Sequence, residues 1–288
     1  MKREGMARRP TRWGEVADLT EGGRARRMAQ LGFGKGIETM GIKIMAAALV
    51  AATLVAGLAH ASPAAAPYIA AAVADPGRPA ADTARDAARK PAQILSFAGV
   101  KPGDAMLEIL PGGGYFTRMF SKAVGPGGHV FAAVPPAKSS DAEPAAAAIA
   151  ASPGYGNVSV IELNAAAMAA LPKLDLIWTS QNYHDLHLSR VHTDVPALDR
   201  LWFSLLKKGG VVVIEDHVAL AGSPATETAD KLHRIDPAVA RREMEGAGFV
   251  FDGETDILRN PADPHTALIF DPSIRGKTDQ FVYRFRKP

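Results

Sequence analysis

The sequence predicts an α/β protein in which a mostly parallel sheet carries helices on both faces. From residue 82 onward, short apolar runs alternate with segments of helical spacing, and this alternation is typical of parallel strands joined by helical crossovers. The run 211–215, VVVIE, is apolar almost throughout, as expected for a strand buried on both faces. Ligands of such sheets bind beyond the carboxyl ends of the strands, so the residues that follow strands are the first candidates for a site.

Composition and charge exclude several classes of function. Cysteine is absent from the 288 residues, which excludes disulfides, Cys-ligated zinc, iron–sulfur clusters and thiol nucleophiles. The first 61 residues hold ten of the 33 basic side chains and five of the 30 acidic ones, so residues 62–288 carry slightly more acids than bases. The body of the chain therefore has no basic stripe for phosphates, and nucleic-acid binding is not expected. No G-x-S-x-G nucleophile elbow is present, which argues against a serine hydrolase.

The first 61 residues are predicted to be a leader that contains a secretory signal peptide. Residues 44–59 form a short apolar run, Lys43 precedes it, and Ala59-His60-Ala61 follows as a small-x-small cleavage site. The run is short for a membrane span, which needs about 20 apolar residues, although a retained N-terminal anchor is the alternative. Because a charged region of more than forty residues is unusual, the true start is expected at Met40 or Met45. The mature protein is therefore expected to be periplasmic or secreted, with no stable membrane span.

Residues 62–81 are rich in proline and alanine and are predicted to be a linker with little fixed structure. Residues 82–288 are then one domain, with a first helix over 82–98 that stops at Gly99. Further helices are expected at 115–124, 142–151, 198–206 and 236–247. Seven strands are expected at 105–110, 129–134, 158–163, 174–179, 211–215, 249–258 and 279–286.

A glycine loop stands where the first predicted strand meets the next helix. It reads Pro111-Gly112-Gly113-Gly114, and Glu108 lies inside the preceding strand. Glycines at this place let the backbone approach a ligand closely, and the acid can accept hydrogen bonds from ribose or amine groups. Many α/β turns carry such a loop for packing alone, so the loop by itself leaves both interpretations open.

Taken in order, these motifs resemble the class I S-adenosylmethionine-dependent methyltransferases, and most closely an exported, uncharacterised group of predicted methyltransferases within them. The resemblance covers residues 82–288. The motifs that carry it are Arg85-Asp86-x-x-Arg89-x-Pro91 and the segments 100–104, 108–114, 182–185, 206–210, 216–217, 232–236 and 275–279.

The resemblance implies a Rossmann-like, mostly parallel seven-stranded sheet with an antiparallel C-terminal strand. It also implies a transferase that uses S-adenosylmethionine to methylate a small-molecule acceptor. The cofactor-binding residues that it implies are Glu108, Pro111, Gly112, Gly113, Gly114, Tyr115, Asn164 and Asn182.

Two departures from the family pattern concern the cofactor. Leu110 stands at the first glycine of the loop, and the end of the second strand reads Ala133-Val134-Pro135, with no carboxylate for the ribose hydroxyls. Ribose recognition is then expected to rest on Glu108 or on backbone groups, while Asn164 would serve the adenine edge.

Histidines and acids follow the fourth and fifth strands. His184-Asp185 and Asp216-His217 are expected to lie close together because these strands are neighbours in the implied fold, and His233 follows them in the chain. A methyl acceptor needs a base that takes its proton, and histidine suits this task near neutral pH. The candidate catalytic residues are His184, Asp185, His217 and His233.

Two alternatives to a methyltransferase remain open at this point. The same histidines and acids could hold a divalent metal, although their spacing matches no local metal signature, and the sequence assigns no metal site. Because S-adenosylmethionine is made in the cytoplasm, an exported chain could also keep the fold for small-molecule binding. The methyl acceptor and the oligomeric state are not predicted.

Overall fold

The structure is a computed structural model that describes residues 65–136 and 145–288. The predicted signal peptide, its cleavage near Ala61 and the starts at Met40 or Met45 lie outside these residues. No helix among the described residues has the length and apolar character needed to cross a membrane.

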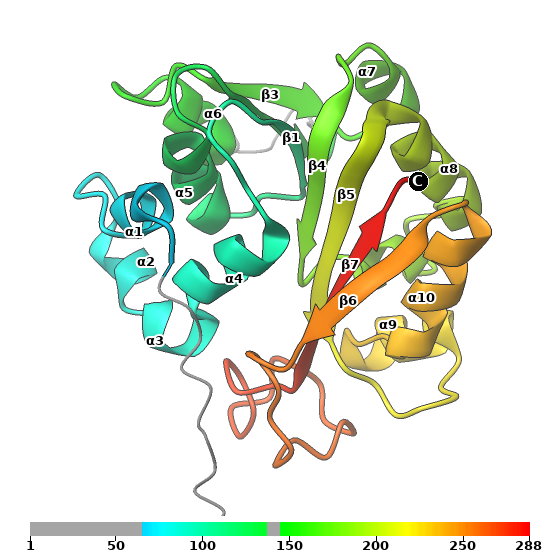
Figure 1. Cartoon of the computed structure of the whole chain (residues 1–288). Coiled ribbons are helices and arrows are strands. Elements are labelled where there is room, and N and C mark those ends of the chain that lie inside the picture. Colours follow the sequence, from blue (N-terminus) through cyan, green and yellow to red (C-terminus); the bar gives the residue numbers. More distant parts are fainter. Residues whose placement is uncertain (1–64, 137–144) are drawn as a thin grey trace, which may run out of the picture. The chain divides into compact units, whose positions relative to one another are not determined.

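Seven strands form one sheet in the order β3-β2-β1-β4-β5-β7-β6 (Figure 1). Strands β1 to β5 run parallel, whereas β7 pairs antiparallel with both β5 and β6. The predicted α/β class, the seven strands and the antiparallel C-terminal strand are therefore confirmed. The strands are β1 (Ala105–Ile109), β2 (His129–Val134), β3 (Val158–Glu162), β4 (Leu174–Ser180), β5 (Leu206–His217), β6 (Val250–Thr255) and β7 (Gln280–Arg286).

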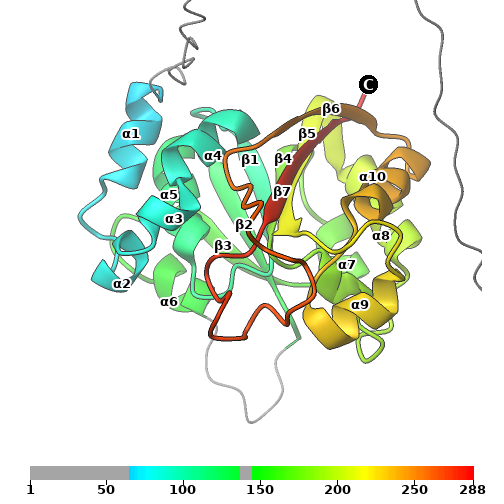
Figure 2. The same ribbon diagram turned by 90° about the horizontal axis from the view of Figure 1, so that it is seen from below.

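Helices pack on both faces of the sheet because side chains of the central strands alternate between two cores. Helices α1, α4 and α5 lie on one side of the sheet, and α8 and α10 lie on the other (Figure 2). Met106 faces the core on the side of α1, α4 and α5, whereas Leu107 faces the core on the side of α8 and α10. Val213 and Ile214 of β5 divide in the same way. The helices are α1 (Pro67–Val73), α2 (Ala80–Thr83), α3 (Asp86–Arg89), α4 (Pro91–Ala98), α5 (Tyr115–Val124), α6 (Ala145–Ala150), α7 (Ala165–Ala169), α8 (Val195–Leu205), α9 (Ala225–Leu232) and α10 (Pro237–Gly246).

The expectation of little fixed structure over 62–81 is wrong for the part that the structure describes. Helix α1 lies there, and its Ile69 and Ala72 are buried in the core beside α4 and α5. The hydroxyl of Tyr68 also donates a hydrogen bond to the carbonyl of Val100 at 2.8 Å. Ile69 and Ala72 are three residues apart, so they share one face of the helix and give it a place to dock.

The helix predicted over 82–98 is instead three short helices, α2, α3 and α4. The break before α4 falls at Lys90, which takes a left-handed conformation with φ of 46°. The residue before a proline is disfavoured in a right-handed helix, and Pro91 then begins the next helix at a position that suits proline. This break turns the end of α3, with Arg89, toward the sheet.

The functional edge of the sheet is built where the strand order changes direction, between β1 and β4. Strand β5 extends past the last residue of β4, because Ser180 pairs with Glu215 and two further residues of β5 pair with β7. Asp216 and His217 are these two residues. The longer strand therefore holds both side chains at the carboxyl edge, next to the glycine loop of β1.

Candidate functional site

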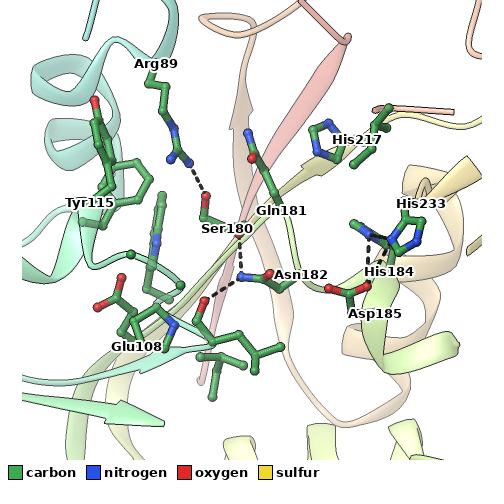
Figure 3. A pocket seen from close by; sticks show the side chains of 18 of the residues that line it. Arg89, Glu108, Tyr115, Ser180, Gln181, Asn182, His184, Asp185, His217 and His233 are labelled. Carbon is green, nitrogen blue, oxygen red and sulfur yellow. Dashed lines mark hydrogen bonds and ion pairs between the residues drawn. The ribbon is translucent and has the colours of Figure 1, made fainter. Parts of the chain in front are cut away.

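A cavity of about 390 Å³ opens at the carboxyl ends of β1, β4 and β5 (Figure 3). It lies at the point of the sheet where the strand order reverses, which is the usual ligand site of such folds. Ten of the twelve predicted site residues line it, namely Glu108, Pro111, Gly112, Gly113, Tyr115, Asn182, His184, Asp185, His217 and His233. The structure thus brings the predicted cofactor loop and the predicted catalytic residues to one cavity.

The glycine loop keeps a left-handed backbone even where the sequence has no glycine. Leu110 has φ of 53° and Gly112 has φ of 54°, a region in which most side chains are strained. A Cβ atom added at Gly112 or Gly113 would meet no atom within 4 Å, so both residues face open space in the cavity. Leu110 therefore carries a side chain in a backbone conformation that favours glycine.

Gly114 has a different role from the one predicted for it. It is not among the residues that line the cavity, and it caps the N-terminus of α5 with φ of 77°. A Cβ atom at this position would collide with the side chain of Ile149. The structure therefore explains Gly114 by the close packing of α5 against α6.

Glu108 is a buried acid on the wall formed by β1. Its Oε2 accepts a hydrogen bond of 2.6 Å from the hydroxyl of Thr117. Burial raises the pKa of Glu108 to about 7, although the Thr117 hydrogen bond and the charge of Arg89 act in the opposite direction. The group therefore changes its charge near neutral pH.

Asn164 lines a second cavity, of about 550 Å³, rather than the first. Its Oδ1 accepts a hydrogen bond from the backbone of Ala167 at 2.8 Å and so caps α7. The second cavity has largely apolar walls, which include Leu163, Met168 and Leu188. Leu110, Asp185 and Arg190 line both cavities, so the two spaces lie side by side.

Asn182 joins the end of β4 to the loop after β1. Its Nδ2 donates to the carbonyl of Leu110 at 3.0 Å and to that of Ser180 at 2.7 Å. These bonds hold Leu110 in its strained conformation. The residue predicted to bind the cofactor therefore positions the loop in the structure, while it also lines the cavity.

The opposite wall is a cluster of histidines arranged around Asp216. This buried carboxylate accepts the ring Nδ1–H of His184 at 2.7 Å, the backbone N–H of His184 at 2.7 Å and the backbone N–H of His217 at 2.7 Å. His184 Nε2 lies 3.2 Å from His233 Nδ1 and 3.4 Å from Asp185 Oδ1. The expected proximity of the residues after β4 and β5 is thus present in the structure, with Asp216 as its centre.

The charges of this cluster follow from burial and from Asp216. Burial lowers the pKa of His184, but the charge of Asp216 and its hydrogen bond outweigh burial and leave the pKa raised. Burial would raise the pKa of Asp216, yet His184 and the hydrogen bonds leave it lowered. Burial lowers the pKa of His217 to about 3, so this ring is neutral at physiological pH and shares a hydrogen bond of 2.7 Å with Thr278. Burial and the neighbouring His184 also lower the pKa of His233.

Several cavity residues were not assigned from the sequence. Arg89 donates to the hydroxyl of Ser180 at 2.7 Å and lies 3.4 Å from the buried Glu215. The sequence offered a reason to consider Arg89 as a site residue, because it belongs to one of the motifs that carry the family resemblance. Ile269 and Phe270 also line the cavity, and they come from the long loop between β6 and β7, in which neither residue belongs to a quoted motif.

Backbone strain is concentrated at the cavity. Among the residues that the structure describes, six non-glycine residues have positive φ. Three of them, Leu110, Gln181 and His233, line the cavity. Each follows the end of a strand or helix, and residues of this kind gather at functional sites because the surrounding structure enforces them.

Comparison with known proteins gives neighbours at the level of fold. No protein-family model matches the chain, and no curated protein matches its sequence. Among solved structures, a SAM-dependent methyltransferase from Aquifex aeolicus is similar, with 18% identity, a TM-score of 0.47 and coverage of 68% of this chain and 88% of that one. An S-adenosylmethionine-dependent methyltransferase from Mesorhizobium loti is also similar, with 15% identity, a TM-score of 0.46 and coverage of 70% of this chain and 99% of that one. Fibrillarin from Aeropyrum pernix, with natively bound S-adenosyl-L-methionine, has 12% identity, a TM-score of 0.42 and coverage of 67% of this chain and 73% of that one.

Proposed function

We propose that this protein is an S-adenosylmethionine-dependent methyltransferase that acts on a small-molecule acceptor. One observation carries the proposal: a single cavity at the switch point of a seven-stranded sheet has the glycine loop and Glu108 on one wall and the histidine cluster on the other (Figure 3). Methyl transfer needs this division, because one wall must hold the donor while the other prepares the acceptor.

The residues on the loop side fit the cofactor. Gly112 and Gly113 leave open space beside the backbone, and Glu108 offers a carboxyl group on the same wall. The second cavity has largely apolar walls and shares Leu110 with the first cavity. It suits the adenine ring of the cofactor. Ribose recognition would rest on Glu108 and backbone groups, because the end of β2 carries no acid. When bound, the cofactor supplies an electrophilic methyl group on its sulfonium.

The histidine wall would activate the acceptor. Asp216 accepts the Nδ1–H of His184, which leaves the lone pair of Nε2 at the cavity wall, 3.2 Å from His233 Nδ1. In this position His184 can take the proton of an acceptor hydroxyl or amine, and Asp216 stabilises the imidazolium that forms. His217, held by Thr278, would shape the acceptor site as an uncharged ring.

The proposal extends to the place where the protein works. The leader suggests export and cleavage after Ala61, and the motif resemblance is strongest to an exported group of predicted methyltransferases. The cofactor would then have to reach the compartment outside the cytoplasmic membrane. Mass spectrometry of the mature protein decides this part, and an intact N-terminus in the cytoplasmic fraction would contradict it.

Calorimetry with S-adenosylmethionine and S-adenosylhomocysteine tests the central claim. The purified protein is expected to bind both, and Gly112→Val is expected to abolish binding because a side chain there would enter the cofactor space. Gly99→Val is the matched control: Gly99 also has positive φ, at 76°, with open space around its Cβ position, but it does not line the cavity. If Gly112→Val binds the cofactor like the parent, the proposal is wrong.

A further inference from the structure

Three side chains on the histidine wall place donor atoms in a nearly regular triangle. His184 Nε2 lies 3.2 Å from His233 Nδ1. Asp185 Oδ1 lies 3.4 Å from each of these two nitrogens. Two imidazole nitrogens and one carboxylate oxygen thus converge on one point at the cavity wall, within the part of the chain that the structure describes.

These separations match the coordination geometry of a transition metal. Zn²⁺ binds imidazole nitrogen and carboxylate oxygen at about 2.0–2.2 Å with tetrahedral geometry, so neighbouring donors lie roughly 3.3–3.5 Å apart. Hydrogen bonding explains the triangle less well, because a charge-assisted hydrogen bond between imidazole and carboxylate measures about 2.7–2.9 Å. The His184–Asp216 contact has that length, at 2.7 Å, whereas both contacts to Asp185 are longer.

The surroundings of His184 orient it as a ligand. Its Nδ1–H is taken by Asp216, and its backbone N–H donates to the other oxygen of the same carboxylate at 2.7 Å. A carboxylate that holds the far nitrogen of a histidine fixes the ring and raises its basicity toward a metal. The ring is 1% exposed, so Nε2 has one direction open to it, toward the other two donors.

The remaining coordination position would face the cavity. All three donor residues line the cavity, and the side chains of Asp185 and His233 are 30% and 19% exposed. The buried Arg234 is paired with Asp263 at 2.8 Å. Asp185 and Asp216 bring two carboxylates to the site, and Arg190, which lines the same cavity, brings one positive charge.

We propose that His184, Asp185 and His233 bind one divalent transition-metal cation, with Zn²⁺ as the best match to the donors, and that its open position takes the acceptor. Three protein ligands and one exchangeable position are the pattern of catalytic rather than structural zinc sites.

The role of the cation rests on the proposed function and deepens it. An acceptor hydroxyl on the cation would lose its proton to solvent water, because a coordinated oxygen is more acidic than a free one. The bond from that oxygen to the methyl carbon then forms as the methyl–sulfur bond breaks, and the electron pair of the broken bond stays on sulfur.

Zinc titration of the chelator-treated, full-length protein tests the site. Calorimetry with ZnCl₂ is expected to show one Zn²⁺ per chain, and MgCl₂ at millimolar concentration is not expected to compete, because imidazole suits zinc better than magnesium. Asp185→Asn and His233→Gln are expected to weaken zinc binding at least 100-fold. Asp216→Asn, which removes the carboxylate that orients the His184 ring, is expected to weaken zinc binding about 10–100-fold.

A matched histidine variant controls for loss of imidazole in general. His265→Gln removes a half-buried histidine whose Nε2 meets only Asp279, at 3.0 Å, and zinc binding is expected to stay unchanged. Far-ultraviolet circular dichroism checks that each variant is folded. Absence of stoichiometric zinc binding, or zinc binding by Asp185→Asn or His233→Gln that is as tight as that of the wild type, would overturn the site.

Cofactor binding by the chelator-treated protein separates this inference from the proposed function. If S-adenosylmethionine binds and zinc does not, the metal site is wrong and His184 remains the base. If zinc binds and the cofactor does not, the metal site stands and the methyltransferase proposal is wrong.

Discussion

The two walls of the cavity are built by different means. On the wall of β1, the backbone shapes the glycine loop: Leu110 and Gly112 are held in left-handed conformations, and the Asn182 side chain bonds to the carbonyl of Leu110. On the wall of β4 and β5, side chains set the geometry, because Asp216 alone accepts three hydrogen bonds from two histidines. The first wall therefore depends on φ and ψ, and the second on individual polar groups, so substitutions on the two walls should have different consequences.

The largest effect is expected from His184→Ala on the side-chain wall. Turnover should fall by about 10²–10⁴-fold, the usual contribution of an acid–base group, while S-adenosylmethionine binding persists because the loop is untouched. Release of S-adenosylhomocysteine with a panel of hydroxyl and amine acceptors measures turnover, and calorimetry measures binding. Parallel loss of both would show that the walls are not separable.

Asp216→Asn should have the largest effect on stability. The amide cannot satisfy the same donors, and removing one partner of a buried charged pair costs about 3–5 kcal/mol of unfolding free energy. Urea unfolding measures this cost. Asp185→Asn is the control on the same wall, and because its side chain is 30% exposed the expected loss is below about 1 kcal/mol. Equal losses for the two variants would contradict a network centred on Asp216.

On the backbone wall, Glu108 should give a pH-dependent stability. Its pKa is raised by burial to about 7, while an unfolded glutamate has a pKa of about 4.3. The folded protein therefore retains a proton that the unfolded chain loses, and the stabilisation present at low pH is lost as pH rises from about 4 to about 7. The loss is at most about 4 kcal/mol.

Comparing the wild type with Glu108→Gln isolates this contribution, because glutamine keeps an oxygen for Thr117 but does not titrate. The unfolding free energy is expected to decrease from pH 5 to pH 8 by a larger amount for the wild type than for the variant. Other buried acids, such as Asp199 with a pKa raised by burial to about 7, contribute equally to both proteins. An identical decrease in the two proteins would contradict the assignment to Glu108.

The smallest effect is expected from Leu110→Gly. Relief of the left-handed strain contributes about 1–2 kcal/mol, and loss of the partly buried side chain costs a similar amount, so the stability should change by less than about 1 kcal/mol. Leu110→Val should destabilise clearly more, because a β-branched side chain tolerates positive φ worst. Thermal unfolding of both variants compares them directly, and a larger loss for glycine than for valine would show that the side chain, not the backbone, controls this wall.

The sequence predicts most of the strands of the sheet. It also predicts that the site lies at the carboxyl ends of those strands. The strands are recognisable because burial on both faces makes them apolar runs, and His184 and Asp216 could be placed together because parallel strands end at the same edge. Helix α1 was missed because its short alanine-rich sequence resembles a linker, and its stability comes from tertiary contacts with α4 and α5. Local pattern does not contain those contacts.

One physical cause limits what the sequence can say about the site residues. Asn164 and Gly114 satisfy local demands, a helix cap and a close helix packing, and a one-dimensional pattern does not distinguish such demands from ligand contacts. Phe270 reaches the cavity only through the path of the long loop before β7. In each case the deciding information is the arrangement of segments distant in the chain.

The position of β7 has a consequence for the order in which the protein can be completed. Strand β7 follows β5 and β6 in the chain, yet it lies between them in the sheet and pairs with Asp216 and His217. Until residues 280–286 have been synthesised, β5 therefore presents an unpaired edge, of the kind that invites pairing with other chains. The glycine loop, by contrast, follows β1, whose two neighbours β2 and β4 both precede β5 in the chain, so the histidine wall is the later of the two walls to gain its full set of strand partners.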